Sequence, residues 1–369
     1  MYTEMVKIIE AGIAFDRKKV IRYAAVFADN LVRSGDVNLA NRIRAVISRT
    51  HGVPVALDSL GAKPVDGESH MEIVDVTYPT GDFGSLILDH FVEDEVRDFV
   101  ASYAKRDELF RLGAEVSNSL LLYGPPGCGK TSVAKLIAAQ TGLPLVTARF
   151  DTLVSSLLGS TSKNIRQVFE YAARMPCVLF LDEFDVIAKM RDDKNELGEL
   201  KRVVNGLLQE MDAFSPESIL IAATNHHELL DKAVWRRFGK ILMLAMPSGQ
   251  TIERLLRMNL DGRDDGFLAN RRAVARAVAA LVGCSHSGVK TIAMNALKNA
   301  VVAGRGKVSV GILQKESYLF KHHAIADDRE YVAFLLRNGF SIRCIHNDFG
   351  LPLRMVREVS LELNKGGKA

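Results

Sequence analysis

The sequence predicts an α/β fold: a P-loop open parallel sheet with helices on both faces, followed by an all-helical lid, with small helical N-terminal and C-terminal modules. Three observations predict it. Short apolar runs alternate with longer helical segments, a glycine-rich loop directly follows one of these runs, and the pattern becomes helical throughout after residue 248. Alternation of strands and helices is the pattern of an open parallel sheet covered on both faces.

The chain has 369 residues, which is enough for about two domains. Its first part shows apolar side chains at helical spacing, such as Val20, Ala24, Phe27 and Leu31. The expected parts are a helical N-terminal module (1–50), a Gly/Pro/Ser-rich linker with a short strand near its end (51–83), the α/β domain (84–247), the helical lid (248–314) and a helical tail (315–369).

The composition narrows the class of protein. Hydrophobic residues make up 48% and charged residues 25%, which predicts a well-filled core, and the net charge of +4 is too small to indicate nucleic-acid binding by itself. The four cysteines (Cys128, Cys177, Cys284, Cys344) are far apart and form no CxxC pair, which argues against a disulfide framework or a zinc site. No signal-peptide layout and no apolar run near the ~20 residues of a membrane span is present, so a cytoplasmic protein without a membrane segment is expected.

The segment "LLLYGPPGCGKTS" predicts a nucleotide site, because GxxxxGKT follows an apolar strand and precedes a helix. Its glycines let the backbone curl so that N–H groups point inward at phosphate oxygens. Lys130 would bring a positive charge to the terminal phosphates and Thr131 a hydroxyl to magnesium, while Cys128 is a small filler. The expected loop residues are Gly124, Pro125, Pro126, Gly127, Cys128, Gly129, Lys130, Thr131 and Ser132.

The segment "CVLFLDEFD" describes a buried strand that delivers carboxylates at its carboxyl end, the edge where ligands bind in open α/β sheets. Asp182 would hold Mg²⁺, and Glu183 would orient and deprotonate the attacking water. Asp185 is expected to be structural, near a helix start. The alternative is an acidic strand end that faces solvent.

A further apolar strand, "LIAATN", ends at Asn225. An amide at this place can hydrogen-bond both the attacking water and the terminal phosphate. The alternative is a buried asparagine in a turn.

Two arginines, Arg236 and Arg237, stand side by side in "KAVWRRFGK", and no acidic partner stands nearby in the sequence. Successive helical residues point about 100° apart, so the two arginines need not do the same work. The alternative is a pair of solvated surface arginines.

These motifs, in this order, resemble the AAA family of ATPases over about residues 84–305. "GPPGCGKT" and "VLFLDEFD" fall where that family has its two Walker motifs, "IAATN" at its first sensor and "LLDKAVWRRFGK" at its arginine fingers. The resemblance implies Mg²⁺-dependent hydrolysis of ATP. It also implies a homo-oligomer, a closed ring of six subunits, in which Arg237 reaches a neighbour's ATP and Arg236 supports it. The chain looks most like small bacterial stand-alone members akin to the FtsH and spastin groups.

The sequence departs from the family pattern at two places. The segment 283–297, "GCSHSGVKTIAMNAL", resembles the second-sensor helix but has no Arg, which points to the protein-remodelling subgroup that lacks it. Where members that thread polypeptides carry an aromatic residue, this chain has Leu157-Leu158-Gly159. Leu offers less rigid contact area than an aromatic ring, so three modes stay open: a weak grip on a threaded chain, a tug on one short segment, or a nucleotide-timed scaffold.

The tail "LLRNGFSIRCIHNDFGLPLRMVREVSLELNK" resembles a helix-turn-helix, with a turn at Gly350 and a second helix that carries Arg354 and Arg357. The same spacing suits an ordinary packing or partner-docking module. Three functions therefore stay open: an ATPase that remodels or moves a protein partner, an ATP-dependent nucleic-acid-associated switch that uses the tail, and an ATPase subunit that gates a separate enzyme such as a subtilisin-like protease.

Overall fold

The computed structural model describes residues 72–114, 116–149, 158–185 and 197–366, with scattered positions between 23 and 65. These residues form two compact units. The first unit contains the sheet and its helices, and the second contains residues 244 onward together with the segments 87–93 and 124–129. Most of the expected N-terminal module, and Leu157 of the departing loop, lie outside the described residues.

A six-stranded sheet with the order β1-β3-β4-β5-β2-β6 forms the centre of the first unit. The strands are β1 (Val74–Thr77), β2 (Ser119–Tyr123), β3 (Leu145–Arg149), β4 (Val178–Asp182), β5 (Ile219–Thr224) and β6 (Lys240–Met243). Five of them are mutually parallel, as the sequence predicts, whereas β1 pairs antiparallel with β3. The sheet is therefore mixed. Strand β1 joins an edge from outside the strand–helix alternation, so no crossover helix sets its direction.

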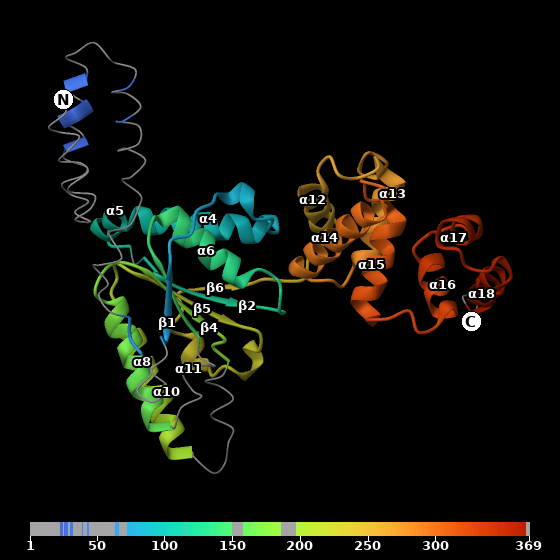
Figure 1. Ribbon diagram of the computed structural model, residues 1–369. Helices are drawn as coiled ribbons and strands as arrows, with labels where there is room; N and C mark the ends of the chain where they lie inside the picture. The colour runs from blue at the N-terminus through green and yellow to red at the C-terminus, as the bar shows by residue number, and fades with distance from the viewer. Residues whose placement is uncertain are drawn as a thin grey trace. The chain divides into compact units, whose positions relative to one another are not determined.

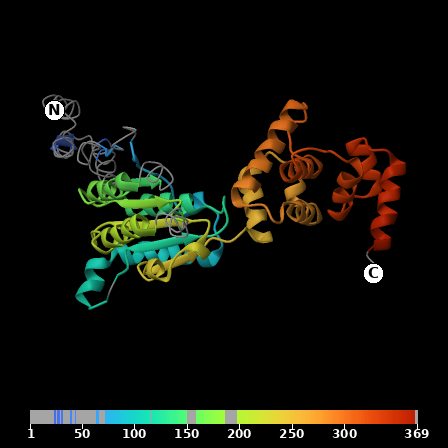
Figure 2. The ribbon, with the colours of Figure 1, turned by 90° about the horizontal axis from the view of Figure 1, so that it is seen from below.

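Helices cover both faces of this sheet, which explains why β4 and β5 read as continuous apolar runs. Figure 1 shows α6 (Lys130–Thr141) on one face, and α8 (Leu158–Ala172), α10 (Leu197–Asp212) and α11 (Lys232–Trp235) on the other; Figure 2 gives the second view. The remaining elements before the second unit are η3 (Phe83–Ser85), α4 (His90–Ala104), α5 (Arg106–Arg111) and η4 (His227–Leu229).

The strand order has one consequence for the site. Because β2 lies between β5 and β6, the connection 225–239 from β5 to β6 must pass over β2. Leu121 belongs to the core under α8 and α10. Side chains two residues apart share a face, so Ser119 and Tyr123 point to the same side as Leu121. The connection covers that side.

The second unit is helical throughout, as predicted, and its helices begin at well-defined caps such as Ser248, Asn270, Ser285 and Ser309. The helices are α12 (Gly249–Leu260), η5 (Phe267–Ala269), α13 (Arg271–Leu281), α14 (His286–Val302), α15 (Val310–His322), α16 (Asp328–Arg337), α17 (Ile342–Phe349) and α18 (Leu353–Gly366).

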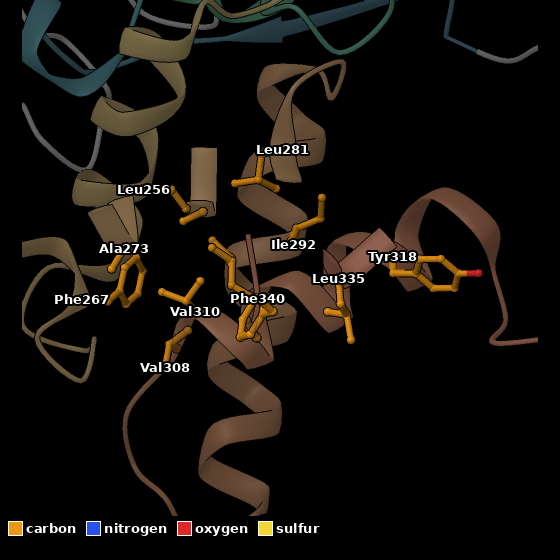
Figure 3. Packing of buried hydrophobic residues seen from close by; sticks show 14 of the residues in the cluster. Leu256, Phe267, Ala273, Leu281, Ile292, Val308, Val310, Tyr318, Leu335 and Phe340 are labelled. Atoms are coloured by element: carbon orange, nitrogen blue, oxygen red, sulfur yellow. The ribbon is translucent and has the colours of Figure 1, made fainter. Parts of the chain in front are cut away.

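The lid and the tail share one hydrophobic core, which brings together Leu256 and Leu281 of the lid with Leu335 and Phe340 of the tail (Figure 3). Helix α15 runs through residue 314, where the sequence placed a boundary. The tail contains three helices, and Gly350 (φ 69°) makes the turn between α17 and α18, as the sequence predicts. Among the described residues no single helix has both the length and the apolar character to cross a membrane, although α13 and α14, bent by 120°, meet these criteria as a pair.

Candidate functional site

The loop that follows β2 has the backbone that the glycines predicted. Gly124, Gly127 and Gly129 all adopt positive φ, at 138°, 75° and 99°, where a residue with a side chain is strained. Within the second unit, Ser287 N–H donates to the carbonyl of Gly127 at 3.1 Å. Cys128 is buried, with 1% of its surface exposed, in agreement with its expected role as a filler.

Gly124 has the tightest surroundings of the three, because a Cβ there would lie 2.1 Å from the carbonyl oxygen of Leu244. We expect Gly124→Ala to lower the free energy of unfolding by about 2 to 4 kcal/mol and to abolish nucleotide binding. Gly304→Ala is the matched control, because Gly304 also has positive φ (70°) but would place its Cβ in open space. Its cost should be about 1 to 2 kcal/mol. Urea unfolding and titration with a fluorescent ATP analogue measure both effects, and equal losses in the two variants would contradict this account of the loop.

Lys130 and Thr131 open α6. Lys130 is nearly buried, with 8% of its surface exposed. Thr131 Oγ1 lies 3.4 Å from Asp182 Oδ2 at the carboxyl end of β4, so two hard oxygen donors converge as Mg²⁺ requires. No group of three or more His, Cys, Asp or Glu side chains suited to a metal occurs in the described part of the chain. The remaining ligands of such an ion would be phosphate and water oxygens, which suits magnesium bound together with a nucleotide.

Glu183 follows directly and is exposed. Its φ of 55° lies in the left-handed region, which costs a non-glycine residue free energy and is often found at functional positions. Hydrogen bonds on both sides hold this backbone: Glu183 N–H donates to Asp182 Oδ1 at 3.0 Å, and Phe184 N–H donates to the Ala223 carbonyl at 2.9 Å.

The turn after β5 is fixed by buried polar contacts. Asp185, 4% exposed, accepts a hydrogen bond from Thr224 Oγ1 at 3.2 Å, and His226 N–H donates to that Oγ1 at 3.0 Å. Asp185 therefore has a structural role, because it holds the end of the neighbouring strand β5. Asn225 Oδ1 is buried and has no hydrogen-bond partner among the described residues. A buried acceptor without a partner is costly, so this oxygen is suited to receive a proton donor such as a water molecule.

The paired arginines differ in their surroundings. Arg237 makes a forked contact with Asp212, the last residue of α10, with Nε–Oδ1 at 2.8 Å and Nη2–Oδ2 at 3.0 Å. No acidic partner stands nearby in the sequence, and the partner of Arg237 comes from another helix, 25 residues upstream. The guanidinium of Arg236 is exposed and makes no hydrogen bond or ion pair with described residues.

Arg237 lies at the amino ends of the strands, whereas Thr131, Asp182 and Glu183 lie at their carboxyl ends. Ser119, the first residue of β2, donates its hydroxyl to the Arg237 carbonyl at 3.0 Å and accepts from Gly239 N–H at 3.1 Å. The glycine-rich loop begins after Tyr123, the last residue of β2. At about 3.3 Å per residue in a parallel strand, the two ends of this strand are ~13 Å apart. The structure thus brings Thr131, Asp182 and Glu183 together, but not Arg237 with them.

In the tail, an arginine on the second helix of the expected helix-turn-helix forms an ion pair within the protein. Arg354 of this helix pairs with Glu358 at 3.0 Å, and Glu362 of the same helix pairs with Arg329 of α16 at 2.6 Å. The contact with Arg354 lowers the pKa of Glu358. The lid and tail together also line a groove of about 1210 Å³. These features favour a packing module over a DNA-reading one.

Comparison with known proteins gives the family. The sequence profile of the "ATPase family associated with various cellular activities (AAA)" matches residues 120–246. A Sinorhizobium fredii protein, described as an uncharacterized AAA family ATPase, is 37% identical over 270 residues, which is 73% of this chain and 79% of that protein. The ATP-dependent zinc metalloprotease FtsH 2 of Symbiobacterium thermophilum is 32% identical over 52% of this chain, and the proteasome-activating nucleotidase of Thermococcus onnurineus is 34% identical over 55%. The matches span only 34% and 52% of those two proteins. The chain belongs to the AAA family of ATPases.

Proposed function

We propose that this protein is a magnesium-dependent ATPase that assembles with copies of itself, as a ring of six subunits, and couples ATP hydrolysis to the remodelling or movement of a protein partner. The position of the arginines carries the proposal. Arg237 lies beside the amino end of β2, whereas the phosphate loop leaves its carboxyl end. An arginine that is to meet the phosphates must therefore come from another copy.

The residues at the carboxyl edge supply the rest of the chemistry. Thr131 and Asp182 would hold Mg²⁺, which neutralises charge on the phosphate oxygens when bound. Lys130 places a positive charge next to the loop. Glu183 takes a proton from the attacking water, and the carbonyl of Asn225 orients that water. Arg237 of a neighbouring copy then stabilises the negative charge that builds on the terminal phosphate, with Arg236 as its support.

A protein partner is supported by the names of the relatives, a zinc metalloprotease and a proteasome-activating nucleotidase. This sequence contains no HExxH motif, and the alternative is an ATPase subunit that gates a separately encoded enzyme such as a subtilisin-like protease. The four cysteines are free thiols, which supports a reducing compartment such as the cytoplasm. The nucleic-acid switch is less well supported, because Arg354 of the tail already has a carboxylate partner.

Hydrolysis per subunit, measured against protein concentration, tests the proposal. We expect the specific activity to rise with concentration, together with the mass measured by analytical ultracentrifugation, because only assembled copies have complete sites. A specific activity that is substantial and constant down to concentrations where the protein is monomeric would contradict it. If purified protein assembles and binds ATP without hydrolysing it, the proposed completion of the site by assembly is also wrong.

A further inference from the structure

Three aromatic rings meet where the connection 225–239 passes over β2. The ring of Tyr123 lies 4.6 Å from that of His227 and 5.7 Å from that of Trp235, and the rings of His227 and Trp235 are 6.3 Å apart. The two contacts of Trp235 are edge-to-face, the arrangement that aromatic pairs favour. The indole N–H of Trp235 donates to the Leu230 carbonyl at 3.3 Å. We call Tyr123, His227 and Trp235 the aromatic triad.

Each member of the aromatic triad adjoins a different part of the catalytic apparatus. Tyr123 is the last residue of β2, so the phosphate loop begins with the next residue. His227 follows Asn225 by two positions, and Trp235 ends α11, immediately before Arg236. One cluster thus links three places: the residue before the phosphate loop, the turn that contains Asn225, and the residue before the paired arginines.

The arginines depend on this cluster more than the phosphate loop does. Strand β2 is held by parallel pairing with β5 on one side and with β6 on the other. Helix α11, in contrast, has only four residues, too few for a helix to be stable by itself. Its N-terminus is capped by Asp231, which accepts from Ala233 N–H at 2.8 Å, and the ring of Trp235 fixes its other end. Loss of that ring would free the helix end from which Arg236 and Arg237 project.

From this geometry we infer that Trp235 is a positioning residue, which acts through its contacts with Tyr123 and His227 to aim Arg236 and Arg237 at the site of the neighbouring copy. The inference rests on the proposed function, since it requires arginines that act between copies. Under this inference, Trp235 affects ATP hydrolysis in the neighbouring subunit and not in its own subunit. Misplacement of a catalytic group by about 1 Å can cost on the order of 100-fold in rate.

Mixed assemblies separate these two effects. Subunits with Glu183→Gln lack the base but can donate arginines, and subunits with Arg237→Ala have the base but donate no Arg237. Neither variant should hydrolyse ATP alone. A mixture should be active wherever a Glu183→Gln subunit donates Arg237 to the site of an Arg237→Ala subunit, which contributes Glu183. Trp235→Ala is then added either to the donor or to the acceptor. We expect the mixture to lose about 10- to 100-fold in rate when the donor carries the change, and far less when the acceptor carries it.

The outcomes distinguish the two proposals. If the first mixture is inactive although both variants co-assemble, the proposed function fails. The mixture can be active while Trp235→Ala lowers the hydrolysis rate equally in donor and acceptor, or does not lower it in the donor. Either result would show that the role assigned to Trp235 is wrong. Trp235→Phe in the donor should recover most of the rate, because it keeps an aromatic ring at the cluster, and failure to do so would also count against the triad.

A spectroscopic measurement covers the case in which Trp235→Ala does not fold. Trp235 is the one tryptophan of the chain, so its fluorescence reports on the aromatic triad directly. Tyr123→Leu in the donor should shift the Trp235 emission to longer wavelength, and the rate of the mixture should fall in the same variant. A shifted emission with an unchanged rate would overturn the inference.

Discussion

Replacing Arg237 with alanine should lower ATP turnover by ~10³- to 10⁵-fold while nucleotide binding stays close to normal. The arginine lies at the amino edge of its own sheet and makes no contribution to its own phosphate loop, so binding should not depend on it. Its loss removes a positive charge from the place where negative charge builds in the neighbour's transition state. Steady-state hydrolysis and titration with a fluorescent ATP analogue measure the two properties separately.

Arg257→Ala is a suitable control, because Arg257 also makes a close contact with a carboxylate, Glu253 at 2.7 Å, but on a lid helix. Its loss should change turnover little. Sedimentation of Arg237→Ala is needed as well, since a variant that no longer assembles would be inactive for a different reason. An assembled Arg237→Ala protein that turns over at the normal rate would exclude the assignment of Arg237 as the finger.

Replacing Glu183 with glutamine should lower the rate of ATP turnover by roughly 10²- to 10⁴-fold and should leave ATP binding unchanged. Glutamine has nearly the same shape but cannot accept a proton from water at neutral pH. The backbone at residue 183 should be unaffected, since both residues carry the same strain at a φ of 55°. Single-turnover hydrolysis with saturating enzyme isolates the chemical step from product release.

Asp185→Asn makes the same chemical change two residues further on. Asp185 is buried and accepts a hydrogen bond from Thr224, so this variant should lower the thermal midpoint of unfolding more than Glu183→Gln does. Normal hydrolysis by the Glu183→Gln protein would refute the assignment of the base.

Local sequence patterns predict much of this molecule. The strand–loop–helix around residues 124–131 and the apolar strand that ends at Asp182 depend on contacts between near neighbours in the chain, and the structure has both. The helical lid is likewise predictable, because its apolar residues recur at helical spacing and its caps are serine and asparagine.

The remaining features depend on contacts between distant segments. The fork between Arg237 and Asp212 arises because α10 and α11 cover the same face of the sheet, which no spacing in the sequence records. The antiparallel pairing of edge strand β1 and the core shared by lid and tail also depend on contacts between distant segments. Tyr123, His227 and Trp235 are single residues in three unrelated motifs, and only the order of strands brings them together.

The placement of Arg237 and the phosphate loop at opposite edges of one sheet also bears on the geometry of assembly. Different surfaces would meet at each contact, so subunits would join head to tail, and such heterologous contacts generate either closed rings or open filaments. An open row always leaves one phosphate loop at its end without a donor. Closure of the ring supplies an arginine to that last loop. Every active site of a closed ring is therefore complete, whereas an opened ring has one site that lacks its arginine and is inactive.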